Sequence, residues 1–128
     1  MDGHDTVYFL CNHCGNLVEL VEDGGVRPVC CGQPMELLEP GSREGASEKH
    51  LPVAAVQGGR VEVRAGAADH PMGEEHHIGW ISLRTRRGMQ RRHLSPGEPP
   101  AAVFLLEDDQ PVAAYAWCNL HGLWRTGL

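Results

Sequence analysis

The chain has 128 residues and a formal net charge of -6, which suits one ordinary domain or a very small domain joined to a medium one. Glycine and proline are abundant and aromatic residues few, so short strands between turns are favoured over long amphipathic helices. The acidic balance argues against a nucleic-acid partner. No run approaches the roughly 18 apolar residues of a membrane span, and the N-terminus lacks signal-peptide regions, so we expect a cytoplasmic protein.

Four of the five cysteines lie in the first 37 residues. Cys11 and Cys14 have the C-x-x-C spacing of a metal knuckle, and Cys30 and Cys31 are adjacent, with Gly24-Gly25 as a predicted hairpin turn between the two pairs. Four thiolates fit one tetrahedral site for zinc or for a single iron. Adjacent residues of an extended strand point to opposite sides, so a site using both Cys30 and Cys31 needs a distorted turn. A vicinal disulfide is the alternative.

The segment 39–47 is polar and contains Gly and Pro, which is typical of a linker or surface loop. The chain beyond it alternates short apolar runs with turns, and Gly58-Gly59 predicts a two-residue hairpin turn. This spacing has no helical period and predicts an all-β fold, an antiparallel sandwich or barrel. The expected strands are Leu51–Val56, Arg60–Ala65, Ile78–Arg84, Met89–Leu94, Ala101–Glu107 and Val112–Cys118, with Trp124 near the end.

Histidines form a second group of candidate metal ligands. Cys118 and His121 have a C-x-x-H spacing that can close on one ion, and a thiolate with imidazoles suits iron, copper or zinc. His76 and His77 are adjacent, so spacing alone does not choose between them. The other candidates are His50 and His70, whereas we expect His4, His93 and His13 to be exposed to solvent.

The order of these motifs resembles the desulfoferrodoxin family, the two-iron form of superoxide reductase. The matching pieces cover essentially the whole chain: C-N-H-C-G-N from Cys11, C-C-G-Q-P-M from Cys30, E-K-H-L-P-V from Glu48, H-P-M from His70 with I-G-W-I behind it, and C-N-L-H-G-L-W from Cys118. Gly73 departs from the family pattern, since relatives often carry an acidic residue there.

The resemblance implies a desulforedoxin-like domain in residues 1–37 and an immunoglobulin-like β-sandwich in residues 38–128. It implies two mononuclear irons per chain. The first would be bound by Cys11, Cys14, Cys30 and Cys31, and the second by His50, His70, His76 and His121 in a plane with Cys118 axial. The family pattern thus selects His76 rather than His77.

The implied activity is the one-electron reduction of superoxide to hydrogen peroxide without dismutation, as an antioxidant defence. In this reading the thiolate of Cys118 donates electron density, which discourages the oxidising half of a dismutase cycle. Lys49 would attract superoxide, and Glu48 would ligate the oxidised iron after the product leaves. The implied partners are a rubredoxin-like electron donor and a second copy of the chain in a homodimer. The alternative is a non-enzymatic zinc-ribbon and β-sandwich protein that binds metal or a partner.

Overall fold

A computed structural model describes residues 6–45 and 47–128, apart from the side chain of residue 48. The chain divides into two compact units, a first that ends at Glu39 and a second that runs from Pro40 to Leu128. Among the described residues, no helix has the length and apolar character that crossing a bilayer requires.

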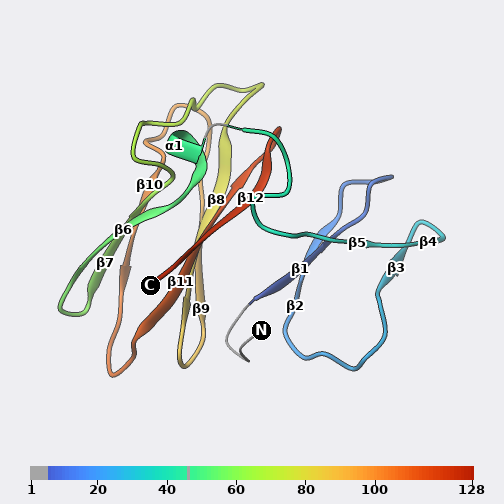
Figure 1. Ribbon diagram of the computed structural model, residues 1–128, viewed down its shortest axis with the longest axis horizontal. Coiled ribbons are helices and arrows are strands. Elements are labelled where there is room, and N and C mark those ends of the chain that lie inside the picture. Colours follow the sequence, from blue (N-terminus) through green and yellow to red (C-terminus); the bar gives the residue numbers. More distant parts are fainter. Residues whose placement is uncertain (1–5, 46) are drawn as a thin grey trace. The chain divides into compact units, whose positions relative to one another are not determined.

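The first unit is built from short antiparallel strands (Figure 1). A three-stranded sheet has the order β2-β1-β5, and a separate hairpin joins β3 to β4. Its small core contains buried Phe9, Cys11 and Met35. The bounds are β1 Val7–Leu10, β2 Leu17–Leu20, β3 Val29–Cys30, β4 Gln33–Pro34 and β5 Glu36–Leu37.

The predicted hairpin at Gly24-Gly25 is wrong. The strand before these glycines, β2, pairs with β1, and the strand after them, β3, pairs with β4. The backbone N–H of Gly25 donates to Oδ1 of Asp23 at 2.8 Å, which makes a local turn within a longer connection. A glycine pair gives the backbone freedom to turn, but it does not determine which strands then pair.

The second unit is a sandwich of two antiparallel sheets that face each other (Figure 1). One sheet has the order β10-β7-β6 and the other β12-β11-β8-β9. Both contribute to one core, in which Val63 and Phe104 from the first sheet join Ile81 and Ala116 from the second. The predicted all-β class and sandwich are confirmed. The bounds are β6 Val53–Gln57, β7 Arg60–Arg64, β8 Ile78–Thr85, β9 Met89–His93, β10 Ala101–Leu105, β11 Pro111–Cys118 and β12 Gly122–Gly127.

The predicted turn at Gly58-Gly59 joins β6 to β7 as expected. The strand before it begins at Val53 rather than at Leu51, because a single helical turn, α1 (Ser47–His50), precedes it. The backbone N–H of Leu51 donates to the carbonyl of Ser47 at 2.8 Å, and Pro52 then prevents the helix from continuing. One turn of helix is too short to leave a periodic pattern, so the sequence did not predict it.

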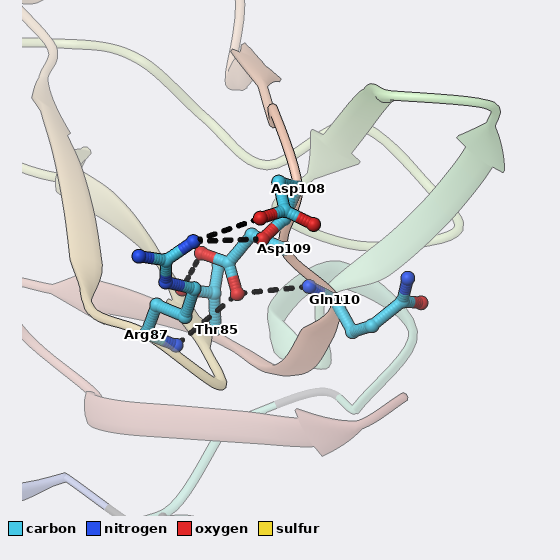
Figure 2. Close-up of polar contacts among 5 residues, drawn as sticks. All are labelled: Thr85, Arg87, Asp108, Asp109 and Gln110. Atoms are coloured by element: carbon cyan, nitrogen blue, oxygen red, sulfur yellow. Dashed lines mark hydrogen bonds and ion pairs between the residues drawn. The ribbon is translucent and has the colours of Figure 1, made fainter.

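Two turns at one end of the sandwich are tied together by Asp109 (Figure 2). Its Oδ2 accepts the Thr85 hydroxyl at 2.6 Å, and its Oδ1 accepts the backbone N–H groups of Arg87 and Gln110 at 3.1 and 2.8 Å. The hydrogen bond from Thr85 is the main reason that the pKa of Asp109 lies below its ordinary value. Asp109 therefore stabilises the fold as a carboxylate.

We expect Asp109→Asn to lower the thermal unfolding midpoint at neutral pH, because one of its two acceptor oxygens becomes an NH₂ group. Since the pKa of Asp109 is depressed in the folded protein, its contribution is complete above the ordinary carboxyl range and is lost as the pH falls through the folded pKa. The difference from wild type should therefore shrink below about pH 4. Tryptophan fluorescence can follow the unfolding, since all three tryptophans (Trp80, Trp117 and Trp124) lie in the second unit.

The neighbouring variant Asp108→Asn is the matched control. The Asp108 side chain is 91% exposed and pairs with Arg87 at 3.1 Å, so we expect little change in the midpoint. Equal effects of the two substitutions at every pH would contradict the role given to Asp109.

Candidate metal centres

The four cysteines of the first unit come together in one cluster, with their sulfur atoms all within 4.8 Å of one another. The sulfur of Cys30 lies 3.7 Å from that of Cys14 and 4.0 Å from that of Cys31. Sulfurs held about 2.3 Å from a tetrahedral metal are separated by about 3.8 Å. These distances fit one metal ion. All five cysteines of the chain are free, which excludes the vicinal disulfide.

A left-handed turn brings both adjacent cysteines into this cluster. Cys30 pairs with Gln33, and the two residues between them, Cys31 and Gly32, have positive φ angles of 54° and 74°. Two central residues with positive φ are the signature of the type I′ hairpin turn. The turn brings the sulfur of Cys31 to the same cluster as that of Cys30, whereas in an extended strand the two side chains would point to opposite sides. The predicted distorted turn is confirmed.

The thiols of the cluster differ in acidity. The backbone N–H of Cys14 donates to the sulfur of Cys11 and is the main cause that lowers the pKa of Cys11 to about 6. Hydrogen bonds with the thiols of Cys14 and Cys11 raise the pKa of Cys31 to about 12. One thiolate thus suppresses the ionisation of its neighbour. A bound cation removes that conflict, and its binding releases the remaining protons.

A second group of donors lies at one end of the sandwich, opposite the turns held by Asp109. Its five donor atoms are also all within 4.8 Å of one another. They come from α1, from the connection between β7 and β8, from the end of β11 and from the turn between β11 and β12. The residues are His50, His70, His76, Cys118 and His121.

The four imidazoles of this group form a square. Neighbouring ring centroids around it are 4.5, 4.6, 4.9 and 4.8 Å apart, with each ring nearly perpendicular to the next. His50 and His76 occupy opposite corners, 6.4 Å apart. Nε2 of His50 lies 3.0 Å from Nε2 of His70 and 3.1 Å from Nδ1 of His121. Nitrogens about 2.1 Å from one metal, at right angles to each other, would be about 3.0 Å apart.

Cys118 supplies the fifth donor. Its sulfur is 3.4 Å from Nε2 of His70 and 3.7 Å from Nδ1 of His121, and the residue is fully buried. No sixth donor belongs to the group within the part of the chain that the structure describes. A metal that accepts six ligands would keep one position for a substrate here, as a reactive site requires, whereas a structural site is closed.

Local contacts indicate which nitrogen of two imidazoles faces a metal. Nδ1 of His70 donates to the carbonyl of Pro71 at 2.7 Å, so the proton lies on Nδ1 and the lone pair of Nε2 faces the group. Nε2 of His76 is buried without any hydrogen-bond partner among the described residues. A buried nitrogen without a partner is costly, and a metal ion is the partner that this position fits. The donor set therefore suits a transition metal such as iron.

Burial keeps two of the imidazoles neutral, as metal ligation requires, and it opposes ionisation of the thiol. Burial lowers the pKa of His70 to about 4, although the bond to Pro71 opposes the shift, and it lowers the pKa of His76 as well. Both imidazoles are thus neutral at neutral pH. Burial raises the pKa of Cys118, while the N–H groups of His121 and Leu120 oppose that change. The Cys118 thiol therefore needs a cation to become a thiolate.

Several local features position this group. A β-bulge between β8 and β11 aligns Trp117 with Trp80 but Cys118 with Ile78, so that Gly79 is the extra residue. Stacking of Trp124 on His50, at 5.0 Å and 28°, covers one ligand.

Gly45, in the polar segment predicted as a linker or surface loop, lies close to the donors, which the sequence did not predict. A Cβ atom on Gly45 would lie 3.1 Å from side-chain atoms of His50, His121 and Trp124. The absence of a side chain at this position lets the backbone cover the edge of the square.

The other predicted site residues have definite places. His77 lies outside the group, and its backbone N–H bonds to Asn119. Lys49 is exposed beside His50, and His13 and His93 are exposed as expected. The predictions for His4 and for the side chain of Glu48 lie outside the described residues.

Comparisons with known proteins agree with these two centres. A family model described as the desulfoferrodoxin N-terminal domain matches residues 5–38, and a second one, described as desulfoferrodoxin, matches residues 42–127. The chain belongs to the desulfoferrodoxin family. A desulfoferrodoxin homolog from Archaeoglobus fulgidus is 44% identical over 119 residues, which cover 93% of this chain and 94% of the relative. A desulfoferrodoxin from Nitratidesulfovibrio vulgaris is 43% identical, covering 91% and 92%.

A solved structure extends the desulfoferrodoxin likeness to the fold. The crystal structure of the superoxide reductase from Treponema pallidum matches with a TM-score of 0.81 at 34% identity, and the alignment covers 98% of this chain and 99% of that one. The likeness thus spans both units.

Proposed function

We propose that this desulfoferrodoxin is a superoxide reductase that carries two mononuclear irons, one at each donor group. The observation that carries the proposal is the square of four imidazoles with Cys118 as a fifth donor and, among the described residues, no sixth. Iron(II) bound there would supply the one electron that, with two protons, converts superoxide to hydrogen peroxide, and would become iron(III). The protein then acts as an oxidoreductase in the detoxification of superoxide.

The residues around the second centre prepare it for an anionic substrate. With iron(II) bound, the neutral imidazoles and one thiolate would give the centre a formal charge of about +1, which would attract superoxide although the whole chain carries -6. Cys118 would donate electron density to a bound metal, and the hydrogen bond from the backbone N–H of His121 to its sulfur, at 3.4 Å, would moderate that donation. We propose that Glu48 would ligate the oxidised iron once the product has left.

The first centre has a different task in this proposal. Four thiolates saturate it, so it stabilises a desulforedoxin-like domain of residues 1–37, while residues 38–128 form the catalytic domain. The compact units defined by contacts divide two residues later, at Glu39. We further propose that the protein is a cytoplasmic homodimer. We propose that it takes part in electron transport by receiving electrons from a rubredoxin-like carrier, and the exposure of Cys14 and Cys31 favours this transfer.

Metal analysis combined with a pulse of superoxide tests the proposed function. Protein purified without oxygen from iron-replete cells should contain two irons per chain and reduce superoxide at the second centre. A colourless preparation that contains only zinc would instead favour the non-enzymatic zinc-ribbon reading.

Lys49→Ala should slow the reaction with superoxide by about tenfold and flatten its dependence on ionic strength, because a positive charge beside the site steers the anion. The charge of Lys49 already acts on the site, since it is among the charges that, after burial, lower the pKa of His76. Pulse radiolysis at several salt concentrations measures both effects. Lys49→Arg is the control that keeps the charge. An unchanged rate and salt slope in Lys49→Ala would remove Lys49 from this role.

A further inference from the structure

His76 is the donor whose position depends on an irregular segment. It lies in the connection between β7 and β8, one residue before His77 and two before the first residue of β8. The Nε2 of His76 has no hydrogen-bond partner among the described residues, so no bond of that atom holds the ring toward the other donors. The other four donors lie at an element end, in a short hairpin turn or, for His70, beside a bonded carbonyl.

Three hydrogen bonds from one residue hold the backbone on both sides of His76. The side-chain Nδ2 of Asn119 donates to the carbonyl of Glu75 at 2.9 Å, and its Oδ1 accepts the backbone N–H of His77 at 2.9 Å. The backbone N–H of Asn119 also donates to the carbonyl of His77 at 3.2 Å. Asn119 directly follows Cys118, so these bonds fasten the His76 segment to the turn that carries two other donors.

The amide of Asn119 can make both side-chain bonds because it combines an NH₂ donor and a carbonyl acceptor at one end. Aspartate can accept from His77 but cannot donate to Glu75, and alanine can do neither. Asn119 is exposed, so removing its side chain strands no buried polar group and should leave the stability of the sandwich nearly unchanged.

We propose that Asn119 is a positioning residue for the proposed second iron centre and that it acts by holding His76 at its corner of the square. This inference rests on the proposed function for the identity of the metal. The three hydrogen bonds of Asn119 to Glu75 and His77, here called the Asn119 clamp, then determine how firmly His76 binds whichever ion the five donors hold. Loss of an outer partner of this kind typically lowers metal affinity by about 10- to 100-fold.

The test compares wild type, Asn119→Ala and Asn119→Asp, all loaded with both irons. Two quantities are measured: the rate at which each centre releases iron to a chelator, and the thiolate-to-iron absorption band of the oxidised second centre. We expect Asn119→Ala to release iron from the second centre about 10- to 100-fold faster and to shift that band, with Asn119→Asp between it and wild type. The four-cysteine centre should be unchanged in every variant, which makes it an internal control.

Gln90→Ala is the matched control, since the Gln90 amide is also exposed and joins β9 to β10 by one bond of 3.0 Å to the carbonyl of Leu105. Wild-type release rates and an unchanged band in Asn119→Ala would overturn the proposal, as would equal loosening in Gln90→Ala. If Asn119→Ala does not fold, Asn119→Asp decides by the same criteria. Repeating the release measurement with Co²⁺ separates the two proposals. An iron-loaded wild type that does not reduce superoxide would refute the proposed function, and the Co²⁺ release rates would still test the role of Asn119.

Discussion

Cys118→Ser is expected to abolish superoxide reduction while the sandwich stays folded. Cysteine supplies a thiolate once a metal binds, whereas the serine hydroxyl stays protonated. The variant therefore loses the electron donation to the metal from residue 118. Removing an outer partner of a metal site costs up to about 100-fold in activity, and the loss of a direct donor should exceed that. Pulse radiolysis of the reduced variant measures the remaining rate.

Two controls separate this effect from damage to the core. Ala116→Ser places a hydroxyl on the same buried face of β11, two residues from Cys118, without removing a donor. Iron in the four-cysteine centre should be retained in both variants. Near-normal superoxide reduction in Cys118→Ser would refute the role of the thiolate, and an equal loss in Ala116→Ser would assign the effect to packing.

The sequence predicted the sandwich because the physical signals for it are local. Alternation in Val61 and Val63 marks a strand with one buried face, and Gly58-Gly59 marks the turn before it. The pairing of strands is not local, which explains the failure at Gly24-Gly25. Nothing within that segment shows that β1 is the partner of β2.

The candidate ligands were accessible for a similar reason, since C-x-x-C and C-x-x-H are short spacings with chemical meaning. Spacing could not choose between His76 and His77, and the structure brings only His76 to the other donors. The contacts of Asn119 and Gly45 were invisible in the sequence. Asn119 bonds to a carbonyl 44 positions away, and Gly45 meets a histidine 76 positions later, so only the folded chain reveals either contact.

Removing one thiol of the first centre tests how independent the two units are. We expect Cys14→Ser to lose the first iron and to loosen the first unit, because the hydrophobic cluster that includes Cys11 is small: its buried members among the described residues are Phe9, Cys11 and Met35. A unit with so small a core depends on its metal for stability. Superoxide reduction at the second centre should remain when a chemical reductant supplies the electrons. Iron content, protease sensitivity of the first unit and the rate with superoxide measure the three effects.

The matched control is His13→Ser, since His13 is exposed in the same knuckle and lies outside the four-sulfur group. It should keep both irons. A Cys14→Ser protein that still holds its first iron would contradict the place of Cys14 in that centre. If the variant folds but no longer reduces superoxide with a chemical reductant, the second centre requires the first one for turnover. Intact reduction with the chemical reductant, together with loss of reduction when a rubredoxin-like carrier is the donor, would instead show that electrons enter through the four sulfurs.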